Sequence, residues 1–364
     1  MKNIRWKLAA LGAALVLAAC GGSGGAGNQT SPVKYSSLVV FGDSLSDVGN
    51  PNVGTIAYLS ANTGGGGTWT INNTGTTGNL IWAARMATLL GLPAACAQET
   101  GLYPNIPGLT GAPAMSHPGC TNYAQGSARV VSPLGPNSRA LQAFGQTTLG
   151  LTAKPVKEQM AAHLAAVGGS YSGTELVTVL AGANDVFMEL ALTAPSSPAD
   201  AVRNMGIYGQ TLGQLVKTEI LAKGAKRVLV LNVPDVAGTP FAKSLPAEQQ
   251  GLIDTLVSTF NTALAAELTG VSGVVLGDAY TASKDQNTNP AQYGITNVTT
   301  PACGPNALSP TPTTPGTALV CNGNNVIAGD VSHYQYADDV HPTPYGHQLL
   351  SQFASKLLAQ AGWL

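Results

Sequence analysis

Four short, continuous apolar runs separated by helical patterns are the feature that most constrains the fold of this chain. The runs cover residues 36–41, 175–182, 226–233 and 273–280. Strands that helices cover on both faces show continuous runs, whereas strands with one wet face alternate. Helical patterns lie at 78–92, 154–167, 199–224 and 246–268, and a last one closes the chain. The alternation predicts an α/β fold, a three-layer α/β/α sandwich around a mainly parallel sheet.

Length and composition allow one large α/β domain or two small ones. The chain has 364 residues, of which 44% are hydrophobic, so a sizeable core can form. It carries 17 Lys and Arg against 18 Asp and Glu. Proteins that bind a phosphate backbone need an excess of basic residues, so we expect no nucleic-acid partner. The chain also contains 44 Gly and 23 Pro, which is typical of long uncharged loops on an ordered scaffold.

The N-terminus resembles the leader of a lipoprotein. Residues 1–19 begin with three basic residues and continue into an apolar run that is too short to span a bilayer, as in a signal peptide. The following cysteine, Cys20, ends a LAAC sequence that resembles a bacterial lipobox, in which it is lipidated. Residues 20–35 then form a flexible tether. We expect a protein anchored by lipid in the cell envelope, at the outer membrane or cell surface, with secretion as the alternative.

Cysteine parity agrees with an oxidising compartment. Without Cys20, the five cysteines leave an even set, for which three pairings are possible. We predict the disulfides Cys96 with Cys120 and Cys303 with Cys321, because each pair brackets a Gly- and Pro-rich loop that has little else to order it. A zinc site built from all four would need a CxxC spacing that the chain lacks, so we expect no metal.

Polar residues with the chemistry of a nucleophile follow the first predicted strand. The stretch VVFGDSLSDVGN, residues 39–50, places two serines and two aspartates within five positions. Ligands of α/β proteins bind at the carboxyl ends of the strands, so Ser44 is expected to face the cleft. A serine hydroxyl needs a base to take its proton and a group that orients the base. Far downstream, Asp338 and His341 have the three-residue spacing that lets one turn bring a carboxylate to the imidazole; Asp339 is the competing carboxylate.

An acyl transfer also needs donors for the developing oxyanion. Asn184, in LAGAND, follows the second predicted strand, and its side-chain amide can donate. Gly126, in NYAQGSA, lies in a predicted turn whose bare backbone lets a substrate approach. With the Ser44 amide they make three candidate donors. Residues 50–77 and 281–335 are too long for plain connections, so we expect them to frame or cover this site.

Four motifs in a fixed order carry a resemblance to a known family. GDSLSDVGN, NYAQGSA, GAND and DDVHPT resemble the consensus blocks of the GDSL, or SGNH, family of serine esterases and lipases, most closely a bacterial branch of lipases, phospholipases and acyltransferases. The resemblance covers residues 36–361 and implies a flavodoxin-like sheet in a hydrolase domain over residues 36–364. It implies the roles already considered for Ser44, Gly126, Asn184, Asp338 and His341. One departure is Ser127, which stands where the second block usually has its second glycine.

The sequence therefore predicts a monomeric serine hydrolase of carboxylic esters that uses no cofactor. Apolar residues beside the motifs, namely Leu45, Trp82, Val186 and Phe187, suggest an acyl-binding cleft, although core packing explains most of them equally well. Fatty-acyl esters are the expected substrates. The alternatives are phospholipase or acyltransferase activity, deacetylation of glycans, and polyester hydrolysis, because this fold accepts all of them. Outside the enzymes, the alternative is a surface-binding lipoprotein without turnover.

Overall fold

The computed structural model describes residues 33–49, 67–72 and 81–364. The predicted leader, Cys20 and most of the tether lie outside the described residues. Among the helices of the described part, none is both long and apolar enough to cross a membrane.

A four-stranded parallel sheet forms the centre of the molecule. Its order is β1 (Leu38–Gly42), β4 (Leu176–Leu180), β5 (Val228–Leu231) and β6 (Val274–Gly277). Each strand coincides with one of the four apolar runs, β1 extending one residue beyond its run to Gly42, so the prediction of a parallel sheet is confirmed. The backbone of residues 121–123 pairs in parallel with the free edge of β1, where Val40 N–H donates to Thr121 O and Tyr123 N–H donates to Val40 O. With this segment at the edge, the order corresponds to a flavodoxin-like sheet.

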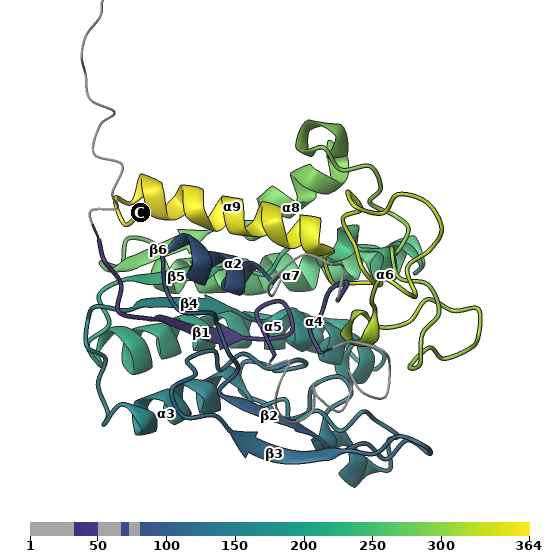
Figure 1. The fold of residues 1–364 in the computed structure, drawn as a ribbon, viewed down its shortest axis with the longest axis horizontal. Helices are drawn as coiled ribbons and strands as arrows, with labels where there is room; N and C mark the ends of the chain where they lie inside the picture. The colour runs from purple at the N-terminus through teal and green to yellow at the C-terminus, as the bar shows by residue number, and fades with distance from the viewer. Residues whose placement is uncertain (1–32, 50–66, 73–80) are drawn as a thin grey trace, which may run out of the picture.

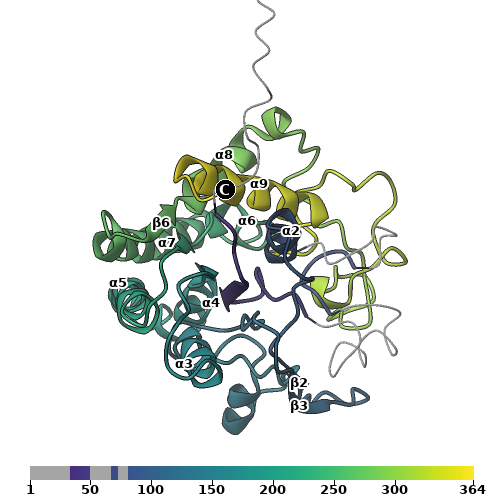
Figure 2. The same cartoon turned by 60° about the vertical axis from the view of Figure 1, so that its left-hand side comes forward.

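Helices cover both faces of the sheet. One face packs on α3 (Val156–Ala166), α5 (Pro198–Leu215), which continues as a π-helical turn, and α7 (Ala247–Leu268). The other face packs on α2 (Trp82–Leu89), α8 (Ala279–Thr288) and α9 (Pro344–Gln360). Alternate strand residues supply the two cores: Val39 and Phe41 belong to the first, Leu38 and Val40 to the second. The three layers are seen edge-on in Figure 1, and Figure 2 shows α2 and α9 together on one side.

Both predicted disulfides are present. Cys96 bonds Cys120 around the hairpin of β2 (Glu99–Leu102) and β3 (Ala112–Ser116), and Cys303 bonds Cys321 within the long segment before α9. The sequence patterns missed this hairpin, and they missed α8 inside the segment expected to be a loop. They also missed the short helices α4 (Ala183–Met188) and α6 (Pro240–Lys243), which follow β4 and β5. These elements lack a long apolar period because they pack at the ends of the sheet.

Candidate active site

The turn after β1 presents Ser44 at the carboxyl edge of the sheet. Gly42 is required just before it, since a Cβ there would lie 2.3 Å from Leu180 O of the neighbouring strand. Gln159 of α3 holds this glycine, accepting from its N–H and donating to its carbonyl. The amides of Ser46 and Asp47 both donate back to Asp43 O, which closes the turn and leaves the Ser44 side chain facing a cavity.

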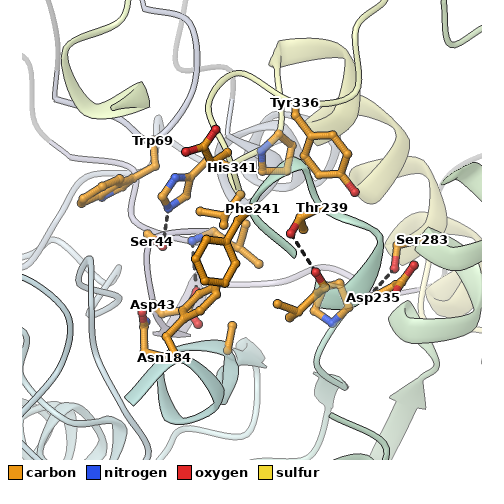
Figure 3. A pocket seen from close by; sticks show the side chains of 18 of the residues that line it. Asp43, Ser44, Trp69, Asn184, Asp235, Thr239, Phe241, Ser283, Tyr336 and His341 are labelled. Atoms are coloured by element: carbon orange, nitrogen blue, oxygen red, sulfur yellow. Dashed lines mark hydrogen bonds between the residues drawn. The ribbon is translucent and has the colours of Figure 1, made fainter. Parts of the chain in front are cut away.

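Ser44, His341 and Asp338 form one continuous hydrogen-bonded chain. His341 Nε2 lies 2.9 Å from Ser44 Oγ, and His341 Nδ1 lies 2.8 Å from Asp338 Oδ2 (Figure 3 shows the first contact). His341 lies 297 residues after Ser44 in the sequence, and Asp338 lies three residues before His341, so only the fold brings the serine to the other two. The structure thus joins the three residues that the sequence singled out as nucleophile, base and orienting carboxylate.

Asp338 is buried but well supplied with donors. Burial by itself would raise the pKa of this carboxyl; the charge of His341 and several hydrogen bonds outweigh burial and hold the pKa below its usual value. Its donors include the backbone amides of Ala318, at 2.7 Å, and of Val340, at 3.0 Å. Asp339, the competitor, is exposed and does not bond the imidazole; its carbonyl accepts from Phe241 N–H. The three-residue spacing therefore identified the carboxylate that contacts His341.

Trp69 packs against the imidazole ring of His341, a contact that no sequence pattern predicted. Its ring lies against His341 with centroids 4.7 Å apart and planes inclined by 32°. The backbone on both sides of Trp69 bonds the loop closed by the second disulfide, for example through Gly67 N–H to Leu319 O. A single tryptophan in a Gly- and Thr-rich segment carries no local pattern, so only the fold reveals the contact.

The residues expected to bind the oxyanion lie on one short loop and the start of α4. Asn184 lines the cavity, and its Nδ2 donates one hydrogen to Ala128 O, at 3.0 Å, which leaves its second amide hydrogen for a ligand. Gly126 N–H, in contrast, donates to Asp47 Oδ2 at 2.9 Å, and Gly126 is not among the residues that line the cavity. This contact argues against the predicted role of the Gly126 amide.

The neighbouring Ser127 has the properties expected of that donor. It adopts a left-handed backbone conformation, with φ of 68°, and it lines the cavity. Within the described part of the chain its N–H has no hydrogen-bond partner. A serine at positive φ is strained, and the strain is retained because the residues on both sides are held. The departure from the family pattern, Ser in place of Gly, therefore falls on the residue that faces the cavity.

Two carboxylates, one partly buried (Asp47) and one fully buried (Asp185), hold the ends of this loop. Asp47 accepts from Gly126 N–H and, through its other oxygen, from Gly49 N–H. Asp185, the residue after Asn184, accepts from Val130 N–H and from the Arg129 guanidinium. Burial raises the pKa of Asp47 to about 6, against the lowering effect of the two amides and of the Trp69 indole. Burial likewise raises the pKa of Asp185 to about 6, with Arg129 opposing it.

Asp43, the residue directly before the candidate nucleophile, has fewer hydrogen-bond partners for its carboxyl oxygens. Its Oδ1 accepts from Leu45 N–H, whereas its Oδ2 is buried and has no hydrogen-bond partner in the part of the chain that the structure describes. Burial raises its pKa to about 7. Asp43 therefore keeps a proton at pH values where an ordinary aspartate is ionised.

The cavity beside Ser44 has a volume of about 500 Å³. In Figure 3, Ser44 and His341 lie on one side of it and Asp235 and Ser283 on the other, with Phe241 between them. Two of the four residues expected in an acyl-binding cleft, Leu45 and Phe187, line the cavity. The other two, Trp82 and Val186, are fully buried in the two cores, as the alternative of core packing proposed.

Comparison with protein families decides where the chain belongs. The family model described as GDSL-like Lipase/Acylhydrolase matches residues 38–353, which is most of the chain. The chain belongs to this GDSL family. The family resemblance inferred from the four motifs is therefore confirmed.

Curated relatives of the GDSL protein are distant. A GDSL esterase/lipase of Arabidopsis thaliana is 28% identical over 146 residues, which cover 36% of this chain and 38% of the relative. An uncharacterized protein in the trpE-trpG intergenic region of Pseudomonas putida is 24% identical over 340 residues, which cover 92% of this chain and 50% of the relative. The chain thus spans half or less of the length of these relatives.

Solved structures resemble the GDSL protein over most of its length but only loosely. An α/β hydrolase from the metagenome of Lake Arreo, Spain, matches with a TM-score of 0.39 and 15% identity, covering 91% of this chain and 97% of that one. An acetylxylan esterase of Geobacillus stearothermophilus matches with a TM-score of 0.37 and 14% identity, covering 88% and 93%. Likeness at this level does not indicate a substrate.

Proposed function

We propose that this GDSL protein hydrolyses carboxylic esters through a Ser44–His341–Asp338 triad and a covalent acyl-enzyme. The observation that carries the proposal is the unbroken hydrogen-bonded chain from Asp338 through His341 to Ser44, at the carboxyl edge of a parallel sheet and at the wall of a cavity. This is the arrangement by which a serine hydroxyl is activated in acyl transfer.

The first half-reaction forms the acyl-enzyme. Ser44 Oγ attacks the ester carbonyl carbon while His341 Nε2 takes the hydroxyl proton. Asp338 accepts a hydrogen bond from His341 Nδ1–H, and this bond orients the ring and stabilises the imidazolium. The tetrahedral intermediate then collapses, the bond between the carbonyl carbon and the alcohol oxygen breaks, and His341 returns the proton to the departing alcohol. In the second half-reaction His341 takes a proton from water, whose oxygen attacks the acyl carbon. The bond between that carbon and Ser44 Oγ then breaks, and His341 returns the proton to Ser44 Oγ as the acid leaves.

The oxyanion is stabilised by three donors on three different segments. They are the amide of Ser44, the free hydrogen of Asn184 Nδ2 and the amide of Ser127, the last in place of the Gly126 amide that Asp47 occupies. Losing one such donor typically costs about 10²- to 10³-fold in kcat. Because Asp47 and Asp185 hold the loop at both ends, the Ser127 amide is fixed before the substrate arrives.

Covalent labelling tests the proposal. The soluble protein from residue 21 onward is exposed to a fluorophosphonate and weighed by intact-mass spectrometry, with Ser44→Ala as the test variant and Ser46→Ala as the matched control two residues away. We expect one label per molecule in the wild type and in Ser46→Ala, and none in Ser44→Ala. A folded wild type that takes no label would contradict the proposal and favour the non-catalytic surface-binding protein.

The anchor and location belong to the same proposal but depend on sequence alone. LAAC before the Gly-rich tether supports lipidation of Cys20 and a place in the cell envelope, with the membrane as partner through the lipid. Expression of the full chain in bacteria fed an alkynyl fatty acid tests this. Wild type should carry the label and fractionate with membranes, and Cys20→Ser should do neither. A wild type that is cleaved and released without label would establish secretion instead.

A further inference from the structure

The cavity beside Ser44 continues far beyond the space that the reacting ester group needs. Ser44 and Asn184 lie on one side of it and Ser283 of α8 on the other (Figure 3), and Ala279, Ala282 and Phe353, from α8 and α9, also line it. An acetyl group is much smaller than a cavity of about 500 Å³, which is in the range that holds drug-sized ligands. The space past the serine is therefore available to a longer part of the substrate.

Apolar side chains form the walls along this length. Phe187, from α4, and Phe241, from α6, lie edge to face with ring centroids 5.4 Å apart. Leu350 and Phe353, from α9, line the far part. All four are only partly buried although they pack on core residues, so part of their apolar surface is left for an occupant. An alkyl chain buries such surface favourably.

Polar groups at the far end are already engaged with the protein. Asp235 accepts from Gly238 N–H, and its own N–H donates to Ser283 Oγ. Ser283 in turn donates to Ala279 O. Tyr336 donates to Asn287 Oδ1. Much of the hydrogen-bonding capacity of these groups is thus used within the protein, so a sugar ring placed here would leave hydroxyl groups unpaired, whereas an alkyl chain needs no hydrogen-bond partners.

We infer that this cavity is an acyl-chain channel, so that the enzyme prefers esters of medium and longer fatty acids to acetyl esters. The inference rests on the proposed function, and it assigns the acyl part rather than the alcohol to the channel. The alcohol must take a proton from His341 and leave during the first half-reaction. A group lodged between Ala279, which is 2% exposed, and the partly buried Leu350 and Phe353 of α9 stays in place until the acyl-enzyme is hydrolysed.

α8 supplies the residue that sets the length of the channel. Ala279 and Ala282 lie one turn apart and line its far end with small side chains. A phenyl group at position 282 would take up space at the α8 wall of the cavity. Thr281, the preceding residue, is exposed and does not line the cavity, so Thr281→Phe is a matched control for adding the same side chain to the same helix.

The experiment measures kcat/KM for p-nitrophenyl acetate, butyrate, octanoate and laurate below their micellar concentrations. In the wild type and in Thr281→Phe, kcat/KM should rise by about fourfold for each methylene that the channel buries, until the channel is full. In Ala282→Phe, acetate turnover should stay within about twofold, while octanoate and laurate fall by at least about tenfold.

Other outcomes separate this inference from the proposed function. A wild type that takes the fluorophosphonate label but prefers acetate to octanoate would overturn the channel and leave the triad standing. An equal loss on all four esters in a folded, fully labelled Ala282→Phe would also overturn it. The last series consists of acetyl esters with alcohols of increasing length. If kcat/KM rose with alcohol length but not with acyl length, the channel would bind the alcohol part of the substrate instead. Absence of labelling would instead contradict the triad.

Discussion

The loops closed by the two disulfides look alike in sequence but contribute to the site in different ways. Their cysteines are 24 and 18 residues apart, and both loops are rich in Gly and Pro. The loop closed by Cys96 and Cys120 holds the edge segment of the sheet, where Gln98 N–H donates to Asn122 O at 2.7 Å. That segment leads into the loop with Ser127, so the first disulfide acts on the oxyanion donor only at a distance.

The second loop touches the triad directly. Its Ala318 amide donates to Asp338 Oδ2, and Cys303 N–H donates to Ala337 O, the residue before that aspartate. Cys303 and Cys321 are fully buried, whereas Cys96 and Cys120 are partly exposed. Asn72, three residues after Trp69, also donates to Cys321 O. The comparison shows that what a stapled loop contacts, and not its length or composition, decides whether it serves stability alone or the site as well.

The largest expected effect comes from the carboxylate that the second loop holds. Asp338→Asn should lower kcat by about 10⁴-fold, because an amide cannot stabilise the imidazolium and favours the wrong tautomer. Asp339→Asn, its exposed neighbour, should change kcat little. Both variants are measured at saturating ester, with circular dichroism to check folding. Equal losses in the two variants would remove Asp338 from the triad.

Removing each disulfide in turn breaks the comparison itself. Both double variants, Cys303→Ala with Cys321→Ala and Cys96→Ala with Cys120→Ala, should lose about 3 kcal/mol of unfolding free energy in the chain-entropy model. Only the first should also lower kcat strongly, by about a hundredfold, because a small displacement of the orienting carboxylate misplaces the base. Urea unfolding and steady-state kinetics check both. An equal loss of kcat in the variant without Cys96 and Cys120 would contradict the inference that only the Cys303–Cys321 loop acts on the triad directly.

Asp47 tests how the oxyanion loop is held. Asp47→Asn should lower kcat by about tenfold, with a smaller change in KM, since one of its two acceptor oxygens is lost and the loop with Ser127 loosens. The wild type should lose additional activity as pH falls through about 6, the pKa to which burial raises Asp47, and the variant should lack this part of the profile. A purely structural role would leave the pH profile unchanged. Asp200→Asn, an exposed aspartate of α5, is the control.

The smallest expected effect is on the pH dependence of folding stability, to which Asp43, the residue before Ser44, and Asp338 contribute with opposite signs. Asp43 has a raised folded-state pKa of about 7, so its contribution to stability is full below its unfolded pKa and is lost as pH rises through 7. Asp338 has a lowered pKa, so its contribution is present above its unfolded pKa and is lost as pH falls.

Scanning fluorimetry between pH 2 and pH 8 checks these opposite signs, because the contribution of Asp338 is lost mainly below about pH 4. Asp43→Asn should flatten the fall in Tm toward neutral pH, by a few degrees. Asp338→Asn should reduce the fall on the acid side. Parallel Tm curves for wild type and Asp43→Asn would show that the buried, unpaired oxygen of Asp43 carries no excess proton.

Much of the fold and the core of the site could be predicted from the sequence. Buried parallel strands leave continuous apolar runs, and short motifs such as GDSL and GAND place chemical groups next to the strand ends, so both signals are local. The spacing between Asp338 and His341 is local too. The predicted disulfides were correct for a related reason, because residues close in sequence meet at low entropic cost.

Only the tertiary structure decided how distant segments complete the site. Gly126 and Ser127 are neighbours in one motif, and the difference between them depends on Asp47, which lies 79 residues away along the chain and takes the Gly126 amide. Trp69 reaches His341 across an even longer separation, and α8 meets α9 at the cavity although a long irregular segment lies between them. Such contacts leave no periodicity or spacing in the sequence, since the fold alone determines which hydrogen bonds are made and which surface stays open.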